Sequence, residues 1–214
     1  MKLPFKVVLA SSSPRRIELL GQLGLSIEVM TPGADETPLR GEKPQALVLR
    51  LAKKKAQSVA QGIATGPVRL VIAADTIVVA PNGKHILGKP KDAADAKRML
   101  RLLSGKRHLV YTGYALLERF PTIDRSVMIR ARAVRSWVRM RKLSSSDIER
   151  YVASGEPMDK AGAYAAQGLG MALVESVQGS HANVVGLPVC QLMQDVEKHF
   201  GVGFLQWKEG RQEA

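Results

Sequence analysis

The pattern of hydrophobic and polar positions along this chain predicts alternating strands and helices. Continuous apolar runs at 7–10 and 70–74 are typical of buried strands, and a shorter run at 27–30 predicts another. Apolar residues recur at helical spacing over 14–23 and 46–60, which predicts two amphipathic helices. The first third of the chain is therefore typical of an α/β protein.

The rest of the chain continues this alternation and adds signals of antiparallel pairing. The pair Asn82-Gly83 is a strong hairpin signal, and Val127–Met140 alternates apolar residues with arginines, as a half-buried strand does. Three further helices are expected, over Asp92–Leu103, from a capping box at Ser146 to Val152, and over Leu187–Phe200. Two further strands are expected over His108–Leu117 and Ala172–Val177, with a loop over 118–125.

These elements predict a mixed β-sheet flanked by helices. We expect one domain over 1–214, with a core over about 7–200 and a loosely ordered tail over 201–214. Composition agrees with a globular protein, because 45% of the residues are hydrophobic and 24% are charged. No apolar run approaches the roughly 20 residues that a membrane span requires, and the N-terminus carries no signal-peptide core.

The chain has a single cysteine, Cys190, which excludes an internal disulfide framework and suits a reducing compartment. We therefore expect a cytoplasmic protein in which Cys190, from its apolar helical context, is buried.

The net charge of +13 indicates an anionic partner, which could be nucleic acid, an anionic membrane or a phosphorylated small molecule. An aromatic content of 5% weakens the case for a surface that stacks single-stranded bases. The arginine face of residues 127–142 has three interpretations. It is a solvated strand face, which we favour, a nucleic-acid surface, or the wall of a dimer or substrate cleft.

Hydroxyls, a helix N-terminus and two guanidiniums meet directly after the first strand. Ser11–Ser13 leads into Pro14, which suits the first position of a helix, and Arg15 and Arg16 follow. Each group favours an anion, so the stretch is a candidate phosphate site. An ordinary serine cap with two solvated arginines explains the same residues, and the P-loop pattern is absent from the sequence.

Acidic residues in a buried strand and in an early loop are candidates for chemistry. Asp75 interrupts a buried apolar run, and burying a charge without a partner is costly. A metal, a lysine or a catalytic role would each account for it, as would a cap at a strand end. The pair Asp35-Glu36 lies in a loop rich in Pro and Gly, where it is either a solvated acidic turn or the source of a metal-ligand carboxylate.

Together the polar candidates form the set that phosphoryl chemistry requires, namely oxygen ligands for Mg²⁺ or Mn²⁺, cations for a polyphosphate and a carboxylate to activate water. The acids are Glu36, Asp75 and Asp159, the cations are Arg15, Arg16, Lys55, Lys89 and Lys160, and the hydroxyls are Ser11, Ser13 and Thr76. No Cys/His cluster has the spacing of a zinc site.

Six motifs follow one another in order: Leu9–Leu20, Ala74–Thr76, Gly88–Pro90, Asp159–Tyr164, Gln167–Gly170 and Asn183–Pro188. Together they resemble the Maf family of nucleoside triphosphate pyrophosphatases, which is named for a link to septum formation. The resemblance implies an ITPase-like α/β fold in which two lobes flank a nucleotide cleft. It also implies metal-dependent hydrolysis of the α–β anhydride of a nucleoside triphosphate to the monophosphate and pyrophosphate.

The resemblance assigns the catalytic base to Asp75, and the metal contacts to Glu36 and Asp75. Substrate binding is expected of Ser11, Ser13, Arg15, Arg16, Lys55, Thr76, Lys89, Lys160 and Gln167. Three of these, Arg15, Thr76 and Gln167, resemble the branch of the family that acts on dTTP and UTP. The family often forms dimers, so a homodimer is expected. The alternatives are a basic nucleic-acid-binding protein and a regulator of division that acts through a protein partner.

Overall fold

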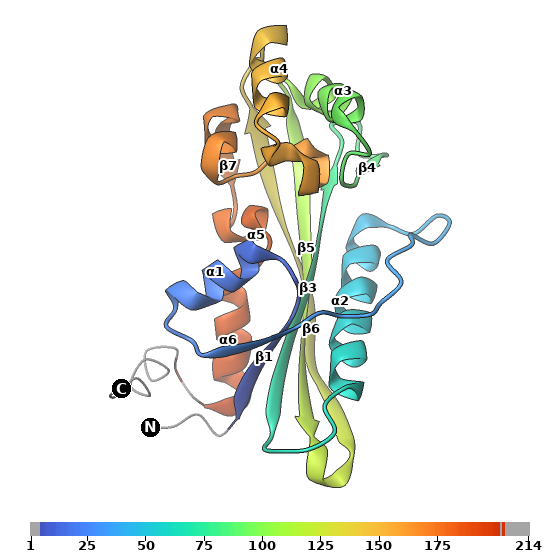
Figure 1. The fold of residues 1–214 in the computed structure, drawn as a ribbon, viewed down its shortest axis with the longest axis vertical. Helices are drawn as coiled ribbons and strands as arrows, with labels where there is room; N and C mark the ends of the chain where they lie inside the picture. The colour runs from blue at the N-terminus through green and yellow to red at the C-terminus, as the bar shows by residue number, and fades with distance from the viewer. Residues whose placement is uncertain (1–4, 202, 204–214) are drawn as a thin grey trace. The chain divides into compact units, whose positions relative to one another are not determined.

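The computed structural model describes residues 5–201 and 203. It divides into two compact units, the first formed by Met1–Asp75, Gly113–Ala133 and Gly186–Ala214 and the second by Thr76–Thr112 and Val134–Val185. The predicted mixed α/β architecture is confirmed (Figure 1), because seven strands form a sheet in the order β2-β1-β3-β5-β6-β7, with β4 paired to β3. No helix in the described part of the chain is long and apolar enough to cross a membrane.

The first unit contains parallel strands with helices on both faces. Its elements are β1 (Lys6–Ala10), α1 (Pro14–Gln22), β2 (Ile27–Met30), α2 (Pro44–Gln61) and α6 (Val189–Phe200), together with parts of β3 (Arg69–Val79), β5 (Arg107–Phe120) and β6 (Arg125–Met140) and the short 3₁₀ helix η1 (Pro121–Ile123). β1 runs parallel to both β2 and β3. Figure 1 shows α2 on one side of these strands and α1 with α6 on the other.

The apolar stripe predicted for α2 forms the core of this unit. Ala52 and Ala56 pack in one buried cluster with Val8 of β1 and Val71 of β3. β5 approaches α2 so closely that a Cβ on Gly113 would lie 2.4 Å from the carbonyl oxygen of Val48. Only glycine allows this approach, which brings the backbone of α2 against the sheet.

The second unit is built around two packed helices. Its elements are β4 (Ile86–Leu87), α3 (Ala93–Leu103), α4 (Ser145–Ala153), three 3₁₀ turns η2 (Glu156–Asp159), η3 (Ala161–Ala163) and η4 (Gly168–Leu173), β7 (Val174–Gln178) and α5 (His181–Val185), with the remaining parts of β3, β5 and β6. Helices α3 and α4 pack against each other, and Leu100 and Ile148 share one core with Val138 of β6. The predicted hairpin at Asn82-Gly83 is confirmed, since β3 and β4 pair antiparallel on either side of it.

Several predicted boundaries are wrong. The loop predicted over 118–125 is shorter than expected, because β5 continues to Phe120 and β6 begins at Arg125, which leaves only η1 and Asp124 between the two strands. Arg119, near the end of β5, is buried. Its guanidinium is satisfied there, because it donates hydrogen bonds to the carbonyl oxygen of Ile63 and to the carboxylate of Asp124. The capping box of α4 is formed by Ser144 and Asp147 and not from Ser146.

Two more predictions are corrected in the C-terminal part of the chain. The last strand begins at Val174, because the preceding residues form the 3₁₀ turn η4. Cys190 is exposed, because the buried side of α6 is formed by Leu192, Met193 and Val196. Most of the predicted tail over 201–214 lies outside the described residues.

Candidate active site

The turn from β1 into α1 brings Ser11, Ser13 and Arg16 together. The Ser11 hydroxyl oxygen accepts hydrogen bonds from the backbone N–H of Ser13 at 3.1 Å and from the guanidinium of Arg16 at 3.2 Å. Arg16 also donates to the carbonyl oxygen of Gly186 at 2.9 Å. Burial lowers the pKa of the Arg16 guanidinium, whereas the negative charges of Asp75 and Glu36 oppose that shift. The turn therefore holds a buried guanidinium in a fixed position, within the electrostatic influence of both acidic candidates.

Lys55 joins the two acidic candidates. Its ammonium nitrogen lies 2.7 Å from Oδ1 of Asp75 and 2.9 Å from Oε1 of Glu36. Lys55 and Asp75 are each only 6% exposed, whereas Glu36 is exposed. The lysine therefore supplies the partner that a buried carboxylate in the middle of β3 requires. Lys53 and Lys54, which precede it on α2, are both exposed.

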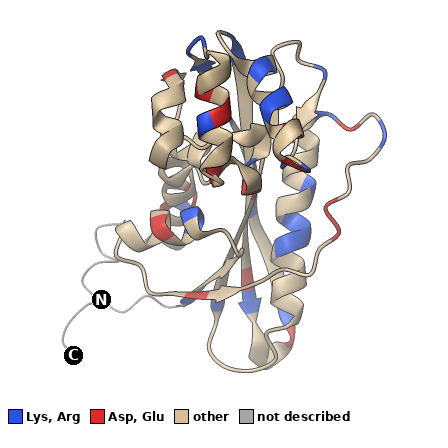
Figure 2. Ribbon diagram, turned by 45° about the horizontal axis from the view of Figure 1, so that its top comes forward, with Lys and Arg blue, Asp and Glu red and all other residues tan. Residues whose placement is uncertain are grey.

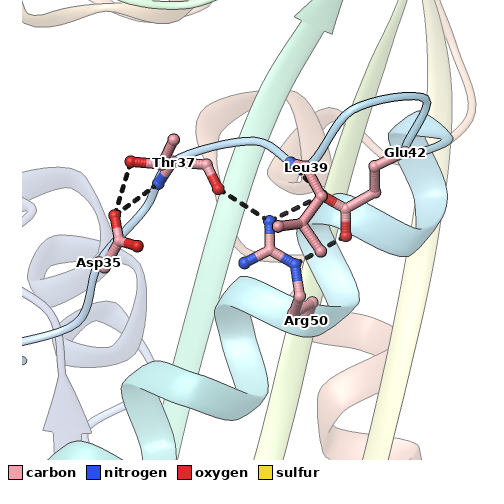
Figure 3. A network of polar contacts seen from close by, with 5 residues as sticks. All are labelled: Asp35, Thr37, Leu39, Glu42 and Arg50. Atoms are coloured by element: carbon pink, nitrogen blue, oxygen red, sulfur yellow. Dashed lines mark hydrogen bonds and ion pairs between the residues drawn. The ribbon is translucent and has the colours of Figure 1, made fainter.

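The loop that carries Glu36 is tied to α2 by a polar network (Figure 3). The Arg50 guanidinium of α2 donates to both carboxylate oxygens of Glu42, each at 2.7 Å, and to the carbonyl oxygen of Thr37 at 3.1 Å. Asp35 accepts from the N–H and the hydroxyl of Thr37. These bonds lower the pKa of Glu42 through Arg50 and that of Asp35 through Thr37. The network fixes the two neighbours of Glu36 relative to the helix that carries Lys55.

The arrangement of Glu36 and Asp75 fits a hard divalent cation. Both carboxylates already contact one cationic centre, the Lys55 ammonium. Within residues 5–201 and 203, no group of three or more His, Cys, Asp or Glu side chains converges on a metal position. Mg²⁺ is held in many enzymes by one or two carboxylates, with substrate phosphates and water as the other ligands. Glu36 and Asp75 are therefore the described residues here that could hold such a cation.

The other predicted residues belong to the second unit. The Thr76 hydroxyl lies 2.9 Å from the hydroxyl of Thr112. Lys160 forms an ion pair with Asp159. Lys89 is exposed in the turn that follows β4, and Gln167 is half-buried directly before η4. The structure thus places Ser11, Ser13, Arg15, Arg16, Glu36, Lys55 and Asp75 in the first unit and Thr76, Lys89, Lys160 and Gln167 in the second.

Sequence reasoning missed Glu156, which organises the turn beside Gln167. Its carboxylate accepts from the Tyr151 hydroxyl at 2.8 Å and from the backbone N–H groups of Leu169 and Gly170 at 2.9 and 2.8 Å. Burial acts to raise the pKa of Glu156, but these hydrogen bonds outweigh burial and lower it. The turn over 167–170 is rich in glycine and has few polar side chains, so its backbone N–H groups need an acceptor from elsewhere in the chain. This need was the signal in the sequence that could have led to Glu156.

Several arginines of the face over residues 127–142 form ion pairs with acids. In the first unit Arg130 and Arg132 lie 3.4 and 4.0 Å from Asp195. In the second unit Arg139 pairs with Glu175 at 3.0 Å and Arg141 pairs with Asp147 at 3.3 Å. These pairs agree with the favoured interpretation of a solvated strand face. Figure 2 shows that Lys and Arg are also spread along α2, outside this strand.

The chain matches one family model and is similar to curated proteins over most of its length. The family model described as Maf-like protein matches residues 6–199. The dTTP/UTP pyrophosphatase of Anaeromyxobacter dehalogenans (strain 2CP-C) is 49% identical over 186 residues, which are 87% of this chain and 90% of that protein. The dTTP/UTP pyrophosphatase of Geotalea uraniireducens is 44% identical over 198 residues, which are 92% of this chain and 97% of that protein. The Ham1 protein of Staphylococcus aureus, a solved structure, aligns with a TM-score of 0.40 and 15% identity over 63% of this chain and 71% of that chain.

Proposed function

Because this chain belongs to the family of Maf-like proteins, we propose that it hydrolyses the α–β anhydride of dTTP and UTP, releasing the nucleoside monophosphate and pyrophosphate. Relatives of 44–49% identity that are named dTTP/UTP pyrophosphatase support this activity. The structural observation that carries the proposal is the buried Asp75 carboxylate, held by Lys55 beside Glu36. A buried carboxylate with a fixed orientation is suited to accept a proton from an attacking water.

In this mechanism Asp75 is the general base. Lys55 contacts its Oδ1, and a carboxylate has a second oxygen that can accept a proton from water. The activated water attacks the α-phosphorus, its proton passes to Asp75, and pyrophosphate leaves with the electrons of the broken α–β bond. The two ion pairs of Lys55 support a role in orienting both carboxylates, in addition to the predicted contact with phosphate.

The remaining cations neutralise the charge of the triphosphate. We assign this role to Arg15, Arg16, Lys89 and Lys160, with the Ser11 and Ser13 hydroxyls as hydrogen-bonding partners of phosphate oxygens. The bonds of Arg16 to Ser11 and Gly186 fix its guanidinium before substrate binds, which reduces the entropy lost on binding. Thr76, adjacent to Asp75 in the chain, and Gln167 contact the base.

Glu36 and Asp75 are the residues that would hold the divalent cation, which we propose to be Mg²⁺ or Mn²⁺. When bound, such a cation neutralises phosphate charge and orients the phosphoryl group. The positive charge of Lys55 offsets the repulsion between the Glu36 and Asp75 carboxylates, so both can lie close together before the cation binds.

A screen of pyrophosphate release tests the proposed function. Incubation with each standard ribo- and deoxyribonucleoside triphosphate should give the fastest release with UTP and dTTP. Addition of EDTA should reduce the rate to background, and added Mg²⁺ or Mn²⁺ should restore it. A different preferred base would overturn the substrate assignment alone. Absence of release with every nucleotide would overturn the proposed activity and favour the alternative of a nucleic-acid-binding protein. Titration with DNA or RNA at several salt concentrations would then measure the binding affinity.

Three further expectations stay predictions. They are a single domain over 1–214, a cytoplasmic location and a homodimer. Sedimentation at several protein concentrations measures the last of these directly.

A further inference from the structure

The loop that carries Glu36 is held by polar contacts and not by burial. Residues 31–43 form neither a helix nor a strand, and residues 35–41 are all exposed. Apolar packing therefore does little to fix the position of this loop. A metal ligand in such a loop is only as well placed as the polar contacts around it make it.

The loop runs along α2 in the direction opposite to the helix. Three residues of α2 contact it, and the later residues of the helix meet the earlier residues of the loop. These contacts join Ser58 to Gly33, Lys55 to Glu36 and Arg50 to Thr37. Ser58 and Arg50 are about 12 Å apart along the helix axis, and the segment from Gly33 to Thr37 spans about 13 Å when extended. The two lengths agree, so Glu36 lies in a nearly extended segment with an anchor on each side.

Arg50 is the anchor next to Glu36. Its guanidinium donates to both carboxylate oxygens of Glu42 and to the carbonyl oxygen of Thr37 (Figure 3). The side chains of Arg50 and Glu42 are only 20% and 9% exposed, so water screens this ion pair less than it screens a surface pair. Glu42 also accepts from the backbone N–H of Leu39 at 3.2 Å. One guanidinium thus holds the loop from Thr37 to Glu42 against α2.

We propose that Arg50 is a positioning residue that holds Glu36 at the cation site and thereby strengthens binding of the divalent metal. Arg50 acts through Thr37, the residue directly after Glu36. Ordering an exposed loop costs conformational entropy, and an anchored loop has lost most of that entropy before the cation binds. The inference rests on the proposed function, because that function assigns Glu36 to the cation.

Arg50→Lys separates the geometry of this contact from its charge. Lysine keeps the positive charge and can still pair with Glu42, but it lacks the rigid planar fork that reaches Glu42 and Thr37 together. The variant should therefore release the backbone beside Glu36 while the net charge near the site stays the same.

The test measures how much Mn²⁺ strengthens binding of α,β-methylene-UTP, in which a CH₂ group replaces the oxygen between the α- and β-phosphorus atoms and prevents hydrolysis there. Titration calorimetry gives Kd for this analogue in EDTA and in excess Mn²⁺, and the ratio of the two values measures the contribution of the cation. Arg50→Lys should reduce this ratio by about tenfold, the effect expected when a metal ligand loses its orienting contacts, with Kd in EDTA close to that of the wild type. Arg98→Lys, which alters a similar forked contact to Asp95 on α3, should change neither value.

A second variant shows whether Arg50 acts through Glu36. Glu36→Gln alone should also reduce the ratio, because a neutral amide is a weaker ligand for Mn²⁺ than a carboxylate is. Adding Arg50→Lys to Glu36→Gln should then have little further effect, since both changes remove the same interaction. Independent losses that simply add would overturn the inference.

The ratio also separates positioning from a merely structural role. A structural role would weaken binding by the same factor in Mn²⁺ and in EDTA, and that result, like an unchanged ratio in Arg50→Lys, would overturn the inference. If Arg50→Lys does not fold, Glu42→Gln decides, because it weakens the same ion pair from the other side and should also reduce the ratio. Failure of the wild-type protein to release pyrophosphate from any nucleotide refutes the proposed function, which is a different result from normal release with an unchanged ratio.

Discussion

Asp75→Asn should lower kcat for UTP by about 10²–10⁴-fold, the usual effect of losing a general base. The amide has nearly the same shape as the carboxylate but cannot accept the proton of an attacking water. The amide oxygen of the introduced asparagine can still accept from Lys55, and Lys55 keeps its ion pair with Glu36, so the fold should be preserved. Steady-state kinetics together with circular dichroism measures both properties.

Asp95→Asn is a suitable control for this variant. Asp95 pairs with Arg98 on the surface of α3, in a position that the proposed mechanism does not use. The control should turn over UTP at close to the wild-type rate. Retained turnover in Asp75→Asn would show that another group activates the water, and the assignment of Asp75 would be wrong.

Lys55→Met should lower the free energy of unfolding by about 3–5 kcal/mol, the usual cost of breaking a buried ion pair by removing one partner. Methionine preserves much of the apolar stem of the lysine but leaves Asp75 buried without its counter-charge. Glu36 is exposed and can be solvated, so the cost arises mainly at Asp75. Urea unfolding followed by fluorescence gives the change.

Two further variants show whether the buried charge is the cause. Adding Asp75→Asn to Lys55→Met removes the unpaired carboxylate, so the double variant should recover most of the lost stability. Lys54→Met, one residue earlier on the exposed side of α2, should change stability by no more than about 0.5 kcal/mol. Equal effects of Lys54→Met and Lys55→Met would contradict the buried ion pair.

The sequence alone predicted that Asp75 needs a partner but did not identify Lys55. The signal was present, because Lys55 lies four residues after Leu51 and four before Val59, both on the buried side of α2. Three consecutive lysines obscured it, since each points about 100° away from the next on a helix. Reading the apolar stripe position by position would have selected Lys55 as the lysine that faces the sheet.

Other features depend on contacts that no local pattern records. The Thr112 hydroxyl donates to the backbone carbonyl oxygen of Asn183, 71 residues away in the chain, and this bond follows from how the strands and α5 pack in the second unit. The capping box was ambiguous, because both Ser144 and Ser146 precede an acidic residue by three positions. Strand alternation and turn signals, by contrast, predicted β2 to the residue, because a short run between a glycine and a proline-containing loop has few alternatives.

The most direct test of the central claim is hydrolysis of UTP in ¹⁸O-labelled water, with mass analysis of both products. Attack of an activated water on the α-phosphorus places one ¹⁸O atom in UMP and none in pyrophosphate, and this is the expected result. Label in pyrophosphate would place the attack on the β-phosphorus. Formation of UDP and inorganic phosphate would show cleavage of a different bond, and either outcome would contradict the proposed reaction.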